Sequence, residues 1–221
     1  MYTINDNPEL LAPDIIEQVK QFPTGVISDV MSGNGTMGYR IKPVANGMKV
    51  AGTAITVNGR AGSNFMIHTA VALAGKGYVL VVNGKGNQSV ALLGDLITRA
   101  AKQQGVEGFV IDGLVRDVAD LRDIGLPVFS IGAVPAAPDR EEGGELNVPI
   151  ACGGVHVNPG DLVIGDDDGV VVVPRSRVSE VLEAAEKKKL SEEQRIEEIA
   201  NHVIVPEWLR KKLQERNLLP K

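Results

Sequence analysis

The chain has 221 residues, of which 43% are hydrophobic, so it is long and apolar enough to bury one sizeable core. A formal charge of −5, a pI near 5.3 and only 4% aromatic residues disfavour a nucleic-acid-binding protein, which normally carries a basic patch and stacking side chains. The single cysteine, Cys152, excludes an internal disulfide framework, and no paired Cys/His spacing indicates a zinc site.

The N-terminal segment, residues 1–14, lacks a basic region followed by an apolar stretch, so it does not resemble a signal peptide. No window reaches the roughly eighteen apolar residues of a membrane span. The sequence therefore predicts a soluble cytoplasmic protein with no membrane partner.

Two short helices are predicted near the N-terminus. Pro13 suits the first turn of a helix that Pro23 ends. Thr24 is then expected to be the N-cap of a second helix, which Gly33 ends.

The middle of the chain alternates predicted strands and helices, which favours a parallel or mixed sheet layered with helices. The run YVLVVNG is continuously apolar, as is typical of a strand covered on both faces. Strands are expected at 49–58, 78–84, 108–111 and 127–132, and helices at 64–74, 94–104 and 116–125.

The pattern becomes β-rich after an exposed, Pro-rich loop over residues 133–144. Short apolar runs alternate with tight turns, and the Asp168-Gly169 pair is the sharpest hairpin signal. The three consecutive carboxylates at 166–168 are interpreted as turn residues rather than as a metal cluster, because they lack the EF-hand spacing.

The chain is predicted to be helical beyond Pro174. Ser191 and Gln194 match a capping box, which predicts that a new helix begins there, and another amphipathic helix follows Pro206. We expect these helices to pack on the body or on a neighbouring subunit. The whole chain, 1–221, is predicted to be one α/β domain with helical extensions at both ends.

The polar residues most able to carry chemistry lie in the stretch 94–120. Asp95 is separated by twenty residues from the adjacent pair Arg116 and Asp117, and Asp120 follows one helical turn later. A short predicted strand lies between the two clusters. Both clusters can therefore meet at one end of the sheet.

Gly94 lies where an apolar run meets a predicted helix start. The free backbone amides of Asp95, Leu96 and Ile97 could bind a carboxylate or phosphate there, because a helix N-terminus attracts anions. The alternative is that Asp95 only caps its helix.

Arg116 offers a planar fork for a carboxylate or an enolate oxygen, and Asp117 offers a hard oxygen for Mg²⁺ or Mn²⁺. Asp120, or Asp112 at the end of a strand, could accept a hydrogen bond from a metal-bound water. An isolated Arg-Asp pair is also consistent with a simple surface ion pair.

The arrangement of Asp95, Arg116, Asp117 and Asp120 resembles the RraA-like family, which includes the metal-dependent 4-hydroxy-4-methyl-2-oxoglutarate aldolases that also decarboxylate oxaloacetate. The resemblance extends through PTGVISDVM, NFMIHTAVA, GDLI and GDDDGVVVVP, and so covers about residues 20–175. It implies an α/β/α sandwich of swivelling-domain type, followed by a helical extension and assembled as trimers or hexamers with sites between subunits.

The resemblance also implies roles for particular residues. Asp117 binds the divalent cation, Mg²⁺ or Mn²⁺, and Asp120 lies in the shell around it. A 2-oxo acid substrate is bound by Gly94, Asp95, Leu96, Ile97 and Arg116.

The expected reaction breaks a carbon–carbon bond and leaves a pyruvate enolate, whose charge the metal and Arg116 stabilise. Asp95 is expected to orient a metal-bound water that serves as the base for the substrate hydroxyl. Glu192 or Glu193 of a neighbouring subunit is a second candidate for this role.

Two rival interpretations remain open. Lys85, between two glycines, could form a Schiff base, although so glycine-rich a loop offers little burial to lower its pKa. The family also includes non-catalytic regulators that bind a ribonuclease, so the fold alone does not establish activity. The histidines at 68, 156 and 202 share no ligand spacing and are expected to be structural.

Overall fold

The computed structural model describes residues 2–218 and is organised around the strand β3 (Val50–Gly59), nearly all of which is buried. β3 pairs with one strand along one side and with two different strands along the other. Its first half pairs antiparallel with β11 (Leu162–Asp166), and its second half pairs antiparallel with β8 (Gly144–Leu146). This strand therefore joins the α/β part of the chain to the later β-rich part.

The other central strands run parallel to β3, so their carboxyl ends meet at one edge of the sheet. The predicted mixed α/β sheet is thereby confirmed, with order β3, β4, β6, β7 at its centre. These strands are β4 (Tyr78–Asn83), β6 (Gly108–Val115) and β7 (Val128–Ala133), with the short β5 (Ala91–Leu93) beside the end of β6. β6 runs four residues beyond the predicted end at 111, and β5 was not predicted as a strand.

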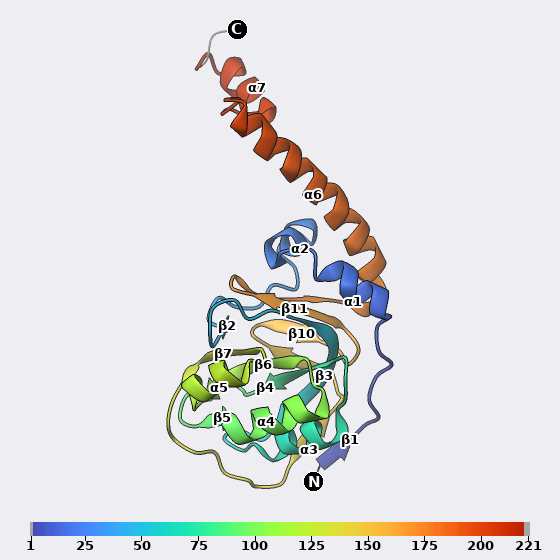
Figure 1. Ribbon diagram of the computed structural model, residues 1–221, viewed down its shortest axis with the longest axis vertical. Helices are drawn as coiled ribbons and strands as arrows, with labels where there is room; N and C mark the ends of the chain where they lie inside the picture. The colour runs from blue at the N-terminus through green and yellow to red at the C-terminus, as the bar shows by residue number, and fades with distance from the viewer. Residues whose placement is uncertain (1, 219–221) are drawn as a thin grey trace.

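Three helices cover one face of the sheet (Figure 1): α3 (Phe65–Leu73), α4 (Asp95–Gln104) and α5 (Val118–Ile124). Their apolar residues form one core with the facing side chains of the strands, including Leu80 and Phe109. Gly105 ends α4 in the left-handed conformation, at φ 89°, as its sequence position predicted.

The opposite face of the sheet is covered first by hairpins. β9 (Ile150–Cys152) pairs with β10 (Val155–Val157), and β11 pairs with β12 (Gly169–Val173) through a two-residue turn at 167–168. The hairpin predicted at Asp168-Gly169 is thus confirmed. Two shorter strands complete the sheet at its edges, β1 (Tyr2–Ile4) and β2 (Lys42–Pro43).

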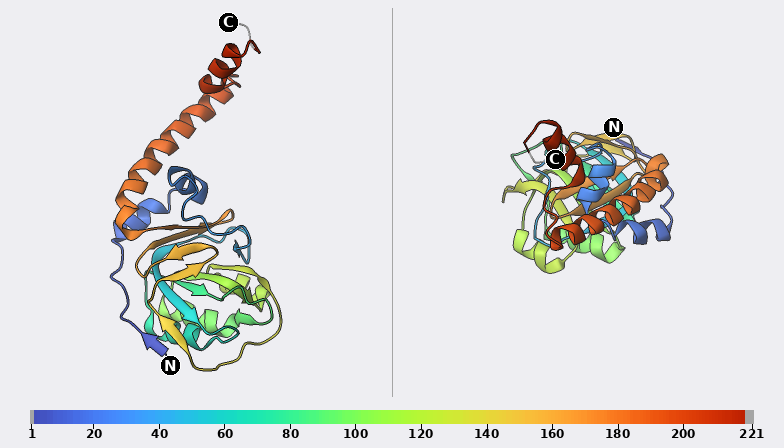
Figure 2. Two further views of the ribbon diagram at one scale, coloured as in Figure 1. Left: turned by 180° about the vertical axis from the view of Figure 1, so that it is seen from behind. Right: turned by 90° about the horizontal axis from the view of Figure 1, so that it is seen from above.

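The terminal helices pack outside these hairpins (Figure 2): α1 (Pro13–Val19), α2 (Thr24–Val30) and the first part of α6 (Val178–Ala200). Thr24 was predicted to be the N-cap of α2, but this is wrong. Pro23 occupies the cap position, and Thr24 is the first helical residue. Its amide and Oγ1 donate to the carboxylate of Asp166, at 2.8 and 2.6 Å. A side chain distant in sequence therefore supplies the cap, which a local pattern cannot reveal.

α6 follows a single 3-10 turn (Arg175–Arg177) and continues without a break through Ser191 and Gln194, so the predicted capping box is wrong. Strong helix formers flank Ser191 on both sides, and they favour continuing the helix over starting a new one. α7 (Glu207–Glu215) follows Pro206 as predicted.

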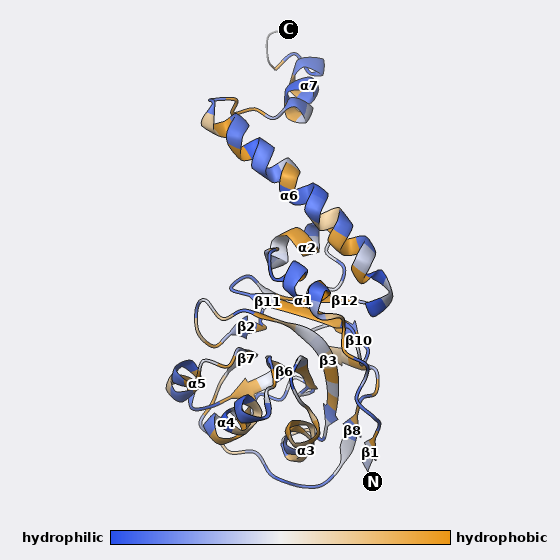
Figure 3. Cartoon of the chain, turned by 45° about the vertical axis from the view of Figure 1, so that its right-hand side comes forward, coloured by the Kyte–Doolittle hydropathy of each residue, from blue (hydrophilic) through white to orange (hydrophobic). Residues whose placement is uncertain are grey.

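Only the first part of α6 packs on the body. Val181 and Leu182 are buried against α2, whereas the rest of the helix projects away and carries α7 at its end (Figures 1 and 3). Among residues 2–218, no helix combines the length and apolarity needed to cross a bilayer.

Replacing Leu182 by alanine is expected to lower the free energy of unfolding by about 2–4 kcal/mol, because it leaves a cavity between α6 and α2. The matched change Ile196→Ala, in the projecting part and 67% exposed, is expected to cost less than about 0.5 kcal/mol. Urea unfolding of both variants measures the difference. Equal losses would contradict the view that only the first part of α6 carries packing energy.

Candidate functional site

The two predicted polar clusters meet at the carboxyl edge of the parallel strands. The amide of Arg116, which follows β6, donates to the carbonyl of Leu93 at the end of β5, at 2.9 Å. Gly94 consequently lies directly beside Arg116 and Asp117. The meeting of the clusters is as predicted.

Asp117 is held by its backbone and by two neighbours. It precedes α5 with φ 59° and ψ 40°, a left-handed conformation that aspartate and asparagine tolerate better than most residues. Its Oδ2 accepts a hydrogen bond from the amide of Asp95 at 3.2 Å and lies 3.4 Å from Nε of Arg116. Its Oδ1 has no hydrogen bond or ion pair among the described residues, so one oxygen of a fixed carboxylate remains available.

Asp95 is the first residue of α4 and does not cap it, so the alternative of a simple helix cap is wrong. Gly94 occupies the cap position, which leaves the Asp95 side chain free to contact Arg99, with Oδ2 and Nε 3.5 Å apart. Nη2 of Arg99 also lies 3.8 Å from Oδ1 of Asp120. Arg99, which sequence reasoning missed, thus lies between two of the predicted carboxylates.

The backbone amides at the start of α4 differ from the expectation in one respect. The amide of Asp95 is already committed to Asp117, and so does not remain free for a ligand. The amides of Leu96 and Ile97 have no hydrogen-bond partner among the described residues. Free amides at a helix N-terminus are donors suited to an anion, so Leu96 and Ile97 retain the donors that were expected to bind one.

Arg116 borders two cavities. One, of about 80 Å³, is also lined by residues Gly94 to Ile97 at the start of α4. The other, of about 290 Å³, is also lined by Asp117 and by Val134 and Pro135 of the following loop. Arg116 is therefore the residue shared by the cavity at the start of α4 and the cavity beside Asp117.

The smaller cavity is also lined by residues with polar side chains that were not predicted to belong to the site, Asn64, His68 and Arg140. Asn64 and His68 are four residues apart at the start of α3, a spacing that places them on one helical face. Oδ1 of Asn64 is buried and has no hydrogen-bond partner among the described residues. The spacing was visible in the sequence, but nothing local linked it to Gly94.

The pKa of His68 is lowered from its ordinary value of 6.5, first by partial burial and then by the charge of Arg140. An NMR titration of the His68 ring should show a midpoint below 6.5, and Arg140→Gln should raise that midpoint. In the unfolded chain the ring gains its proton near 6.5, so the stability linked to His68 is present above that pH and is lost as the pH falls through the folded pKa. A midpoint at or above 6.5 in the unmodified protein would contradict this assignment.

The donor set fits a hydrated Mg²⁺ or Mn²⁺ ion better than a closed metal site. Within residues 2–218, no group of three or more His, Cys, Asp or Glu side chains is arranged to hold a metal ion. Mg²⁺ retains several waters and is bound by as few as one or two carboxylates, which matches the single available oxygen of Asp117. Asp117 is therefore the residue that would hold the ion.

The remaining candidates lie outside this cluster. Glu192 and Glu193 belong to the projecting part of α6, where Glu192 pairs with Lys188 at 3.3 Å (Figure 1). Lys85 lies in an exposed loop. Cys152 is fully buried, and burial together with the charge of Asp112 raises the pKa of its thiol, so it is not suited to act as a nucleophile.

Comparison with known proteins defines the class. The chain combines a mixed α/β fold with two unpartnered helix N-terminal amides and the carboxylate of Asp117 at the carboxyl edge of its sheet. The sequence pattern of the RraA-like family, described as Aldolase/RraA, matches residues 24–172. The chain belongs to the RraA-like family.

A relative from Halalkalibacterium halodurans, named "Putative 4-hydroxy-4-methyl-2-oxoglutarate aldolase", is 38% identical over 191 residues, which cover 86% of this chain and 91% of that protein. Among solved structures, an uncharacterized protein from Pseudomonas syringae pv. tomato matches with a TM-score of 0.77 and 26% identity, over 88% of this chain and 96% of that one. The RNA-processing inhibitor RraA from Thermus thermophilis matches with a TM-score of 0.64 and 30% identity, over 69% and 93%. The family's mixed α/β fold is thus confirmed for this chain.

Proposed function

We propose that the chain is a divalent-metal-dependent carbon–carbon lyase that cleaves 4-hydroxy-4-methyl-2-oxoglutarate and similar 4-hydroxy-2-oxo acids to pyruvate, and that decarboxylates oxaloacetate. One observation carries the proposal. Arg116 borders both the cavity at the uncommitted amides of Leu96 and Ile97 and the cavity lined by Asp117, which has one available carboxylate oxygen. A 2-oxo acid presents a carboxylate and a carbonyl oxygen side by side, which suits such a set of groups.

In the proposed reaction, the amides of Leu96 and Ile97 bind the substrate carboxylate at the N-terminus of α4. The guanidinium of Arg116 donates to the neighbouring carbonyl oxygen. The C3–C4 bond then breaks, its electron pair forms the pyruvate enolate, and Arg116 stabilises the charge that develops on the oxygen. A bound Mg²⁺ or Mn²⁺, held by Asp117, would supply further Lewis-acid stabilisation of that charge.

Cleavage of the aldol substrate also requires removal of the proton from its C4 hydroxyl, which becomes the carbonyl of the second product. Asp95 orients the water that takes this proton. For oxaloacetate, C4 leaves as carbon dioxide and no hydroxyl proton has to be removed. In both reactions protonation of the enolate at C3 yields pyruvate, so one site serves both.

Under this proposal the active unit is a homotrimer or homohexamer. Glu192 and Glu193 lie on the part of α6 that projects from the body, so they can approach an active site only in another copy of the chain (Figure 1). A carboxylate supplied in this way would assist Asp95 with the hydroxyl proton.

A coupled assay of pyruvate release, with Mg²⁺ and with excess EDTA, tests the proposal. We expect metal-dependent release from oxaloacetate and from 4-hydroxy-4-methyl-2-oxoglutarate. The likeness to the RNA-processing inhibitor supports the rival interpretation, a regulator that binds a ribonuclease. No turnover of either substrate, together with inhibition of a ribonuclease by the purified chain, would favour that rival.

Replacing Gly94 by alanine is expected to lower the rate of pyruvate release at least about tenfold by displacing catalytic groups. An added Cβ would lie 2.5 Å from Oδ2 of Asp117 and 3.1 Å from Nε of Arg116, although the backbone at φ −146° accepts alanine. The matched control is Gly25→Ala, where a Cβ meets nothing within 4 Å. Equal activity of both variants would show that Gly94 does not position the site.

A further inference from the structure

Arg99 lies on α4 one helical turn after Asp95, and among residues 2–218 it is the one ion-pair partner of the Asp95 carboxylate. Its Nε is 3.5 Å from Oδ2 of Asp95. The spacing of four residues places the two side chains on the same face of the helix. Neither oxygen of Asp95 accepts a hydrogen bond from the described residues, so this ion pair is the contact that can orient the carboxylate.

Asp95 borders the candidate active site with its backbone already fixed. It lines the smaller cavity together with Gly94 and Arg116, and its side chain is only 28% exposed. The amide of Asp95 donates to Oδ2 of Asp117 at 3.2 Å, which ties the backbone to the other carboxylate of the site. Rotation of the Asp95 side chain is the freedom that remains, and Arg99 is placed to restrict it.

Arg99 is itself held between α4 and α5. Its Nη2 lies 3.8 Å from Oδ1 of Asp120, which belongs to the first turn of α5. One turn after Arg99, Lys102 donates to the carbonyl of Ile124 at the other end of α5. The guanidinium therefore faces carboxylates on two helices, whereas a simple pair on a helix surface involves one helix alone.

We propose that Arg99 is a positioning residue that orients the Asp95 carboxylate for removal of the proton from the C4 hydroxyl of the substrate. This inference rests on the proposed function, in which Asp95 orients the water that takes this proton. Oδ2 of Asp95 faces the guanidinium, which leaves Oδ1 to accept a hydrogen bond from that water. Arg99 lines neither cavity that Arg116 borders, so it acts through Asp95 and not on the substrate.

The two proposed reactions differ in their need for Asp95, and this difference provides the test. Cleavage of 4-hydroxy-4-methyl-2-oxoglutarate requires removal of the hydroxyl proton, whereas decarboxylation of oxaloacetate does not. Arg99→Gln should therefore lower kcat for the aldol substrate at least about tenfold and change kcat for oxaloacetate at most about twofold. The coupled assay of pyruvate release with Mg²⁺ measures both rates.

Two further variants show whether Arg99 acts through its ion pair with Asp95. Arg99→Lys can still pair with a carboxylate four residues earlier, so it should keep kcat for the aldol substrate within about threefold of that of the unmodified chain. Asp95→Asn should show the same selective loss as Arg99→Gln. Adding Arg99→Gln to Asp95→Asn should slow the cleavage no further, because the two changes remove one interaction.

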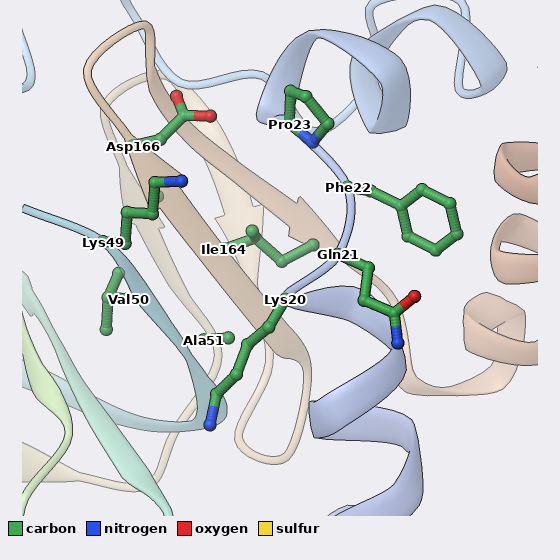
Figure 4. Close-up of a pocket in the computed structure, with 10 residues that line it drawn as sticks. Lys20, Gln21, Phe22, Pro23, Lys49, Val50, Ala51, Ile164 and Asp166 are labelled. Atoms are coloured by element: carbon green, nitrogen blue, oxygen red, sulfur yellow. The ribbon is translucent and has the colours of Figure 1, made fainter. Parts of the chain in front are cut away.

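The matched control is an exposed ion pair at the opposite edge of the sheet. Lys20 pairs with Glu17 at 2.7 Å and borders a cavity of about 430 Å³ between the α1–α2 connection and the start of β3 (Figure 4). Lys20→Gln should leave both rates unchanged. Because Arg99 and Lys20 are both about half exposed, both glutamine variants should melt like the unmodified chain when followed by circular dichroism.

Three results would overturn the role of Arg99 and leave the proposed function standing: equal slowing of the two reactions by Arg99→Gln, unchanged cleavage of the aldol substrate, or equal losses in Arg99→Gln and Arg99→Lys. If the unmodified chain releases pyruvate from neither substrate, the proposed function fails, and the role of Arg99 fails with it.

Discussion

Asp117→Asn is expected to reduce metal-dependent pyruvate release at least about a hundredfold, because it removes the charge that would hold the cation. Asparagine tolerates the left-handed backbone at φ 59° and retains an oxygen that can accept the amide of Asp95. The stability of the chain should therefore change little, which separates loss of the charge from loss of the fold. The rate, measured over a series of Mg²⁺ concentrations, gives the result.

The matched control is Asp120→Asn, one helical turn further along α5. Its side chain is 56% exposed, and its one ion pair among residues 2–218 is with Arg99 at 3.8 Å, so we expect at most a few-fold change in rate. If Asp117→Asn releases pyruvate in excess EDTA as fast as the unmodified chain does with Mg²⁺, the assignment of Asp117 to the metal is contradicted.

Arg116→Lys is expected to lower kcat by about a hundredfold despite keeping the positive charge. The planar guanidinium can face both the small cavity and Asp117, whereas a lysine ammonium is a single point charge that cannot bridge two such positions. If Arg116 stabilises the developing enolate, kcat should fall more than KM rises.

Arg122→Lys is the control, since Arg122 is exposed on α5 and lines neither cavity. A rise in KM alone for Arg116→Lys would limit Arg116 to binding the substrate. An unchanged kcat/KM would remove it from the mechanism.

The meeting of the two polar clusters could be predicted from the sequence because parallel strands place their carboxyl ends at one edge. The predicted helix at 94–104 leads back to the start of the strand after Gly105. The start of that helix and the end of that strand therefore lie at the same edge of the sheet, which brings Gly94 beside Arg116. The hairpin at Asp168-Gly169 was equally visible, since its turn chemistry is local.

The errors concern contacts between residues distant in sequence. Asp166 caps α2 from another element, so Thr24 was given a cap position that it does not occupy. The carboxylate of Asp117 accepts a hydrogen bond from the amide of Asp95, so this amide is not free for a ligand as the sequence predicted. Asn64 and Arg140 reach the cavity from α3 and from a loop, and no local pattern in the sequence joins them to it.

The boundary error in α6 has a different cause. A capping box was read at Ser191, but the same four residues are also compatible with the interior of a helix. Where a motif is compatible with two states, the propensity of the surrounding residues decides between them.

The proposed function requires that the site around Arg116 and Asp117 stabilises a pyruvate enolate. Proton NMR of pyruvate in D₂O with the purified chain and Mg²⁺ tests this most directly, because pyruvate that loses a methyl proton to form the enolate regains deuterium from the solvent at C3. We predict that the methyl signal decays with the unmodified chain, persists after EDTA is added, and persists with Asp117→Asn. If the methyl signal with the unmodified chain and Mg²⁺ decays no faster than in a sample without the protein, the proposed function is contradicted.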